Sequence, residues 1–168
     1  MKIRHFLLLI VVLVSLLAFG CAPARSEMEY LSSGGGGEVS GRFGDMAFSA
    51  VVELSEGGER VCVEYLSPEA LRGLRLTANG ESCEVRLGEV CFSCDVGEVE
   101  GLLRPATAFL LYGDANSVQK EGENTVFVFP SGSTLTLSPK GEPISLVGED
   151  VEMRVVWWQR GTAANFGS

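Results

Sequence analysis

Histidine is almost absent from this sequence, since the only one is His5, close to the N-terminus. The rest of the chain therefore has no imidazole, the side chain used most often as a general base and as a transition-metal ligand. This absence argues against Ser-His-Asp and Cys-His catalysis. Cations are also scarce, because 13 lysines and arginines stand against 22 acidic residues, for a formal charge of −9. Nucleic-acid binding needs clustered cations, so we expect no nucleic-acid partner.

Motifs for phosphate and metal binding are missing as well. The glycine run at 34–37 precedes any strand that the pattern predicts, whereas a phosphate loop follows a strand and opens a helix. Asp45, Asp114 and Glu149 do not have the spacing of an EF-hand. The acidic residues are scattered over predicted turns, and no two of them stand out as a catalytic pair. We therefore expect no enzymatic activity, no metal and no cofactor.

The N-terminus has the three parts of an export signal. Lys2 and Arg4 are basic, residues 6–19 form an apolar run broken only by Ser15, and the run ends in small residues. A transmembrane helix needs about 20 apolar residues, so this shorter run is typical of a cleavable signal peptide. We predict that residues 1–20 are removed. Loss of the two basic residues takes the formal charge from −9 to about −11.

The segment Ala-Phe-Gly-Cys at 18–21 resembles the bacterial lipobox. The resemblance implies cleavage after Gly20, a diacylglyceryl group on the Cys21 thiol and an acyl chain on its amino group. Two or three acyl chains hold a protein stably on a membrane, where one chain does not. The prediction is a lipid anchor on the extracytoplasmic face of the cell membrane. An ordinary signal peptide cut nearby and an uncleaved anchor are the alternatives.

Composition divides the rest of the chain into three parts. Residues 21–40 include Pro23 and a Ser/Gly run, which favours a flexible tether. Residues 41–160 are predicted to form a single β-rich domain, and 161–168 a frayed tail.

Alternating apolar residues predict about eight or nine antiparallel strands separated by turns. Asn79-Gly80 is the clearest turn signal, since this dipeptide favours tight hairpins. The predicted strands are 48–54, 61–65, 74–78, 83–87, 90–94, 125–129, 134–137, 144–147 and 151–158.

Two short helices are predicted between these strands. Ser67 and Pro68 mark the start of the first, and Gly73 its end. The second has apolar residues at helical spacing between 102 and 110, and Gly113 as a stop. Pro105 must lie in the first turn of this helix or kink it.

The segment Tyr-Leu-Ser-Pro-Glu-Ala-Leu-Arg-Gly-Leu at 65–74, with Gly-Glu-Pro-Ile-Ser at 141–145, resembles lipoproteins of anaerobic Gram-positive bacteria. Those are similar to the LolA-type lipoprotein carriers. The resemblance implies a mainly β fold, in which a strongly curved antiparallel sheet forms an incomplete barrel with two short helices on its concave face. In the carriers that face shelters acyl chains. The carriers are soluble shuttles, so a chain anchored by its own lipid could not shuttle freely.

On this resemblance the concave face would bind an apolar ligand. The helix would supply a lid of four residues: Leu102, Leu103, Phe109 and Leu110. Strands would supply the walls: Phe92, Phe127 and Trp157, with Phe48, Val52, Val63, Val85 and Val155. The alternative is that these residues only pack a core. Of Trp157 and Trp158, neighbours on a strand, one should face the core and the other outward.

Four cysteines follow Cys21 and could form disulfides or stay free: Cys62, Cys83, Cys91 and Cys94. Three pairings are possible. The C-x-x-C spacing of the last two invites a redox or zinc interpretation. A redox pair usually begins a helix, however, and a four-cysteine zinc site needs a second closely spaced pair. Cys83 should point inward and Cys62 outward.

Three functions remain open. The first is a non-enzymatic, membrane-anchored lipoprotein that holds an apolar ligand or lipid in a half-barrel. The second is a structural or protein-interaction module on the cell surface, with a closed core. The third is a thiol-disulfide enzyme that uses Cys91 and Cys94.

Overall fold

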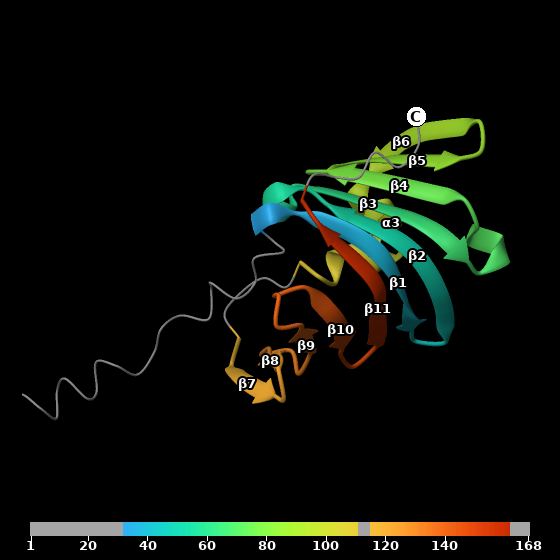
Figure 1. The fold of residues 1–168 in the computed structure, drawn as a ribbon. Helices are drawn as coiled ribbons and strands as arrows, with labels where there is room; N and C mark the ends of the chain where they lie inside the picture. The colour runs from blue at the N-terminus through green and yellow to red at the C-terminus, as the bar shows by residue number, and fades with distance from the viewer. Residues whose placement is uncertain (1–31, 111–114, 162–168) are drawn as a thin grey trace, which may run out of the picture.

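The computed structural model describes residues 32–110 and 115–161. Cys21, Gly20, Gly113 and all of the predicted tail at 161–168 except Gly161 lie outside the described residues. The described residues form one sheet of eleven antiparallel strands in the order β6-β5-β4-β3-β2-β1-β11-β10-β9-β8-β7 (Figure 1). The strands are β1 (Gly35–Phe43), β2 (Met46–Leu54), β3 (Arg60–Ser67), β4 (Leu74–Asn79), β5 (Ser82–Leu87), β6 (Val90–Asp95), β7 (Ser117–Glu121), β8 (Asn124–Val128), β9 (Thr134–Leu137), β10 (Pro143–Val147) and β11 (Val151–Arg160).

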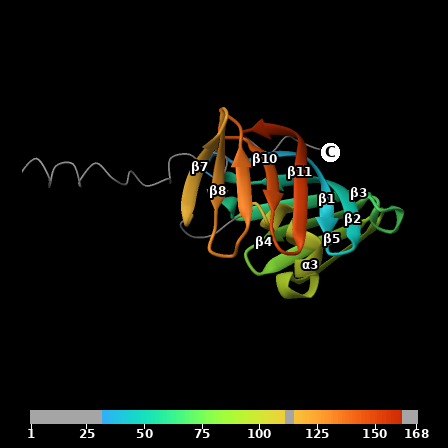
Figure 2. The same ribbon diagram turned by 90° about the horizontal axis from the view of Figure 1, so that it is seen from below.

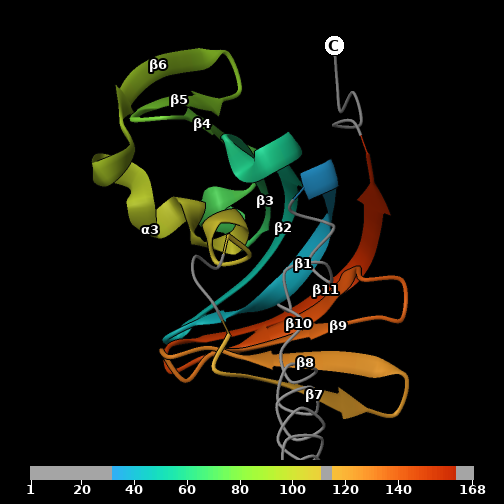
Figure 3. The same ribbon diagram turned by 90° about the vertical axis from the view of Figure 1, so that its left-hand side faces the viewer.

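The sheet is curved and open. β6 and β7 form its two edges, and they are not paired with each other. Figure 2 labels β7, β8, β10, β11 and β1 in this order across the sheet, and β9 lies between β8 and β10. Figure 3 shows the sheet bending through β1 and β2, with the helix α3 (Val96–Thr107) on its concave side. The predicted fold class, a curved antiparallel sheet that does not close, is confirmed.

All nine predicted strands are present, as β2 to β6 and β8 to β11, and two further strands were not predicted. β7 has the sequence SVQKE, and all five of its residues are exposed. An exposed edge strand buries no face, so its sequence shows no apolar alternation. The second unpredicted strand is β1, which lies in the middle of the sheet.

The prediction of a flexible tether through residue 40 is wrong, because β1 begins at Gly35 and pairs with both β2 and β11. Its glycines are needed where neighbouring backbones come close. A Cβ atom on Gly36 would lie 2.8 Å from the carbonyl oxygen of Val52, and one on Gly37 would collide with the carbonyl oxygen of Trp157. Glycine in a strand often marks such a close approach. The folded domain therefore begins several residues earlier than composition indicated.

The two predicted helices also differ from expectation. α3 begins at Val96, directly after β6, so Pro105 lies in its last turn rather than its first. Val96, Val99, Leu103 and Ala106 have the three-and-four spacing of a helix face that packs on the core, so the signal was in the sequence. The other predicted helix is the single 3₁₀ turn η3 (Glu69–Leu71), and a second such turn, η2 (Glu56–Gly58), joins β2 to β3.

The hydrophobic core lies between the concave face of the sheet and α3. Its largest fully buried side chains come from the strands, the helix and the turn that follows it: Tyr65, Phe109, Phe127, Leu54, Leu76, Leu103, Leu135, Leu137, Leu146, Met153 and Val39. Complete burial of one such side chain stabilises a fold by about 1.5–3 kcal/mol. This core holds the helix against β2 and β3.

The glycine run provides a test of the sheet. We expect Gly37→Ala to destabilise the protein by about 1–3 kcal/mol, because the added methyl group has no space beside Trp157. Gly101→Ala is the matched control, since no atom lies within 4 Å of a Cβ at this helical position. Alanine there should raise stability by about 0.8–1 kcal/mol. Urea denaturation measures both changes, and an unchanged midpoint for Gly37→Ala would contradict the packing described.

Candidate functional site

Most of the predicted cavity residues are in the core. Leu103, Phe109 and Phe127 have no exposed surface, and Leu110 is buried while Leu102 is half-buried. The predicted wall residues on β2, β3 and β5 are also buried: Phe48, Val52, Val63 and Val85. All of these side chains belong to or pack against one hydrophobic cluster. The structure thus brings the predicted lid and walls together, and it packs them against each other.

Tyr65 of β3 ties α3 to the sheet. Its hydroxyl donates a hydrogen bond of 2.9 Å to the backbone carbonyl of Leu102. Burial raises the pKa of Tyr65 to about 12, so the hydroxyl is neutral and keeps its proton for this bond at all ordinary pH values. Tyr65 is also fully buried, so its ring is held in the core. The bond therefore holds α3 at a set distance from β3.

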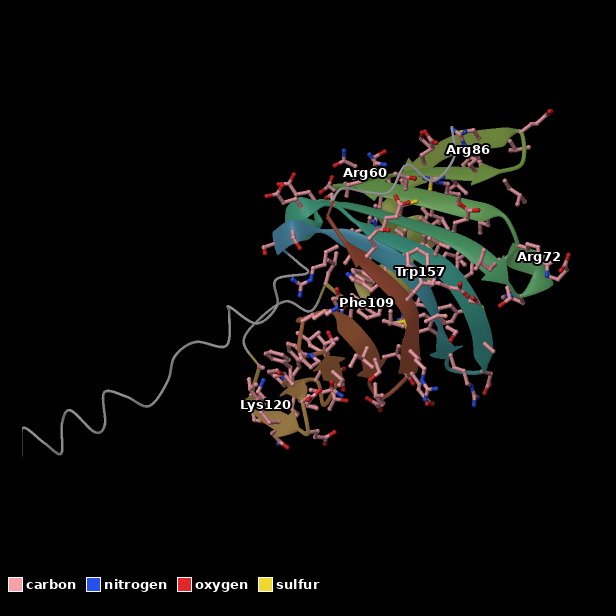
Figure 4. All side chains as sticks on the ribbon, in the orientation of Figure 1. Arg60, Arg72, Arg86, Phe109, Lys120 and Trp157 are labelled. Carbon is pink, nitrogen blue, oxygen red and sulfur yellow. The ribbon has the colours of Figure 1, made fainter. Side chains whose placement is uncertain are left out.

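The two adjacent tryptophans of β11 point in opposite directions, as predicted. Trp158 pairs with Gly37 on the inner face, and its ring lies 6.1 Å from the ring of Phe109, between centroids. Trp157 pairs with Glu38 on the outer face and is 38% exposed. The prediction that Trp157 lines the concave face is therefore wrong. Figure 4 labels Phe109 and Trp157.

Three exposed apolar side chains gather at one corner of the sheet, on the hairpin of β5 and β6. Leu87, Val90 and Phe92, which we call the hairpin patch, are 51%, 64% and 54% exposed. Leu87 pairs with Val90, and Phe92 pairs with the buried Val85. Paired residues of an antiparallel sheet share a face, so the patch lies on the same face as Val85.

The hairpin patch continues the core without a break. Along one row of paired residues, Leu76 is fully buried, Val85 nearly so, and Phe92 is more than half exposed. Along the next row, the half-buried Leu74 pairs with Leu87. Core packing therefore does not explain why the outermost residues are apolar. The sequence predicted Phe92 as a ligand-site residue, but not Leu87 and Val90. Their exposure depends on how much of the concave face α3 covers.

A buried carboxylate lies on the outer face. Glu53 of β2 pairs with Cys62 of β3, and it is buried beside Gly36. Burial raises the pKa of Glu53, while the positive charges of Arg75 and Arg60 act in the opposite direction. The carboxylate of Glu64 on β3 also raises this pKa, so Glu53 has two cations and one further acid as neighbours on the outer face.

Cys62 is on the predicted face of the sheet, but it is buried there rather than exposed. Its sulfur accepts a hydrogen bond of 3.7 Å from the Thr77 hydroxyl on the neighbouring strand. Burial raises the pKa of the Cys62 thiol, which makes it a poor nucleophile at neutral pH.

The other cysteines are distributed over both faces of β5 and β6. Cys91 is exposed and pairs with Arg86, whereas Cys94 is half-buried and pairs with the fully buried Cys83. Cys83 shares the inner face with Val85, as predicted. Residues three apart on a strand point to opposite faces, so Cys91 and Cys94 do not form a vicinal dithiol. The C-x-x-C spacing therefore does not bring these two thiols together.

Within residues 32–110 and 115–161, no three His, Cys, Asp or Glu side chains are grouped so that they could hold a metal ion. None of the helices in this part of the chain has the length and apolar character needed to span a membrane.

Comparison with known proteins gives structural likeness only. No family model matches the sequence, and no curated protein matches it significantly. An uncharacterized conserved protein from Thermus thermophilus is 15% identical, with a TM-score of 0.55 over 83% of this chain and 86% of that one. The chain therefore shares its fold with that protein.

A LolA superfamily protein from Nitrosomonas europaea is also a distant structural neighbour. It is 10% identical, with a TM-score of 0.44 over 86% of this chain and 96% of that one. A likeness this weak carries no argument about function.

The bond between Tyr65 and Leu102 can be tested by removing one hydroxyl group. We expect Tyr65→Phe to reduce stability by about 0.5–1.5 kcal/mol, because the half-buried carbonyl of Leu102 loses this donor while the packing volume is kept. Hydrogen exchange should quicken most for the amides of α3, and those of β8 and β9 serve as the internal control. Equal acceleration throughout the sheet would contradict a local tie.

Proposed function

We propose that this chain is a non-enzymatic, membrane-anchored lipoprotein on the extracytoplasmic face of the cell membrane, and that it binds an apolar ligand or lipid at the open corner of its concave face. The observation that carries the proposal is the hairpin patch. There, the rows of paired apolar residues that begin in the core end in three solvent-exposed side chains, Leu87, Val90 and Phe92. Contiguous exposed apolar residues mark interaction or ligand-binding sites.

The apolar character of the patch suits an acyl chain. The patch spans two paired strands at the edge of the sheet and is continuous with the buried residues Leu76 and Val85. Each methylene group that leaves water contributes about 0.8 kcal/mol, so contact with several methylenes gives measurable affinity without any polar anchor. The protein's negative charge disfavours an interaction driven by anionic headgroups, which leaves apolar contact as the attraction.

The predicted anchor would hold this corner near the bilayer. Thirteen residues separate Cys21 from Gly35, the first residue of β1. A chain of this length spans at most about 50 Å when fully extended. The domain would thus work within roughly one domain diameter of the lipid surface, which suits exchange of an apolar molecule with the membrane but not long-range shuttling.

A protein-interaction module is the second candidate, and two observations favour it. β6 is an edge strand, so it presents unpaired backbone groups beside the hairpin patch. An exposed edge of this kind can accept a further strand from a partner. The packed state of Leu103, Phe109 and Phe127 is also what a closed core would show.

The anchor is tested by Cys21→Ser. We expect this variant to lose its acyl mass and to move from the membrane fraction to the soluble fraction, because the thiol that accepts the diacylglyceryl group is gone. Cys91→Ser, which removes an exposed thiol of the domain, should stay in the membrane fraction. Intact mass spectrometry and fractionation measure both properties, and a Cys21→Ser chain that stayed in the membrane would refute lipidation at this residue.

The ligand site is tested by the double variant Val90→Ser, Phe92→Ser, with cis-parinaric acid as a fluorescent fatty-acid probe. We expect at least about a tenfold loss of probe affinity, since a few methylene contacts are worth more than about 1.4 kcal/mol. Val156→Ser on β11 is the matched control, because this valine is 56% exposed but lies outside the patch. Equal probe binding by all three proteins would eliminate the patch as the site, and strand-directed pairing would become the better proposal.

A further inference from the structure

Cys83 and Cys94 face each other across the outermost pair of strands. Cys83 of β5 is the register partner of Cys94 of β6, and both point to the inner face of the sheet. Directly opposed residues of an antiparallel pair have Cα atoms about 4.5–5.5 Å apart. Disulfides form over Cα separations of about 4.4–6.8 Å, so the backbone already meets this requirement.

The two thiols also contact each other. The side chains of Cys83 and Cys94 are within hydrogen-bonding reach, and the Cys83 thiol additionally donates to the carbonyl of Glu84 at 3.6 Å. Cys83 has no exposed surface, whereas Cys94 is half-buried at the end of the edge strand. One sulfur of the pair is therefore accessible from solvent, and the other is protected behind it.

The fold leaves the other two cysteines without a comparable neighbour among these four. Cys62 is on the outer face of β3, and Cys91 is on the outer face of β6, opposite Arg86 (labelled in Figure 4). Neighbouring strands lie about 4.8 Å apart, so three strand spacings separate Cys62 from Cys91 by about 14 Å. Of the pairings that the sequence left open, the register selects only Cys83 with Cys94.

We propose that Cys83 and Cys94 are a reversible disulfide site that is oxidised by thiol-disulfide exchange with an external disulfide. The Cys94 thiol loses its proton and attacks one sulfur of the external disulfide. That S–S bond breaks, one thiolate leaves and takes up a proton, and a mixed disulfide remains on Cys94. Cys83 then loses its proton and attacks the Cys94 sulfur, which forms the Cys83–Cys94 bond and releases the second thiol. Two cysteines are oxidised, and one disulfide is reduced to two thiols.

The burial of the two thiols determines which of them reacts first with the external disulfide. Burial, reinforced by the neighbouring Cys94 thiol, raises the pKa of the Cys83 thiol, so Cys83 stays protonated at neutral pH. Only the thiolate is an effective nucleophile. The half-buried Cys94 is thus the residue that an external disulfide meets first, and Cys83 is the resolving residue.

The cross-link would fasten the strand that carries the hairpin patch. Within the sheet β6 pairs with β5 alone, and Phe92 is two residues from Cys94 on the same face. A covalent link at Cys94 would prevent β6 from separating from β5. This inference does not rest on lipid binding, so failure of the fatty-acid probe assay would leave it standing.

The test uses the full chain, reduced and then equilibrated with oxidised glutathione before free thiols are blocked with N-ethylmaleimide. Trypsin cleaves after Arg86, so a Cys83–Cys94 bond joins two separate peptides. Cys91 shares a peptide with Cys94, and the Cys91→Ser variant removes that ambiguity. We expect the linked pair in wild type and in Cys91→Ser, its loss in Cys94→Ser, and its release by dithiothreitol.

Peptide mapping of the oxidised wild-type chain tests the proposal even if a variant folds poorly. If Cys83 and Cys94 are both alkylated after oxidation, the proposal is wrong. A link from Cys83 to Cys62 or Cys91 would overturn it as well, because neither residue shares its face and register. A link that survives in Cys94→Ser would have the same consequence.

Discussion

The pairing of β1 with both β2 and β11 is the constraint on which the rest of the structure depends. β2 to β6 follow one another as hairpins, and so do β7 to β11, but only β1 connects the two groups into one sheet. The connection requires backbones so close that Gly36 and Gly37 have no space for a side chain. A glycine run that looks like a linker by composition is thus closely packed in the middle of the sheet.

This arrangement also determines where the helix lies and what it leaves open. β6 and β7 are consecutive strands in the chain but occupy opposite edges of the sheet, so the segment between them must cross from one edge to the other. It begins as α3 on the concave side, where Tyr65 and the core fix it over β2 and β3. The far corner, with Leu87, Val90 and Phe92, is left exposed, and both the proposed ligand site and the thiol pair lie in this corner.

Local patterns predicted the strands that have one buried face, together with the turns between them. Alternation in β2, β3 and β5 and the Asn79-Gly80 turn were sufficient, because these signals depend on neighbours in sequence. β1 and β7 could not be recognised in the same way, since one buries glycine backbone and the other buries nothing. The start of α3 at Val96 was not predicted, because a proline is favoured in the first turn of a helix and Pro105 therefore indicated a later start.

The sequence by itself determined the acidic charge, the lack of imidazole after His5, the lipobox resemblance at Cys21 and, in strands such as β2, β3 and β5, which residues face inward. Only the tertiary structure decided which inner-face residues are covered. Phe127 and Phe92 are both aromatic strand residues, yet the first is fully buried and the second is exposed, because burial depends on elements distant in sequence. The same holds for the thiols: alternation placed Cys83 inward, but only the register of β5 with β6 brought Cys94 to it.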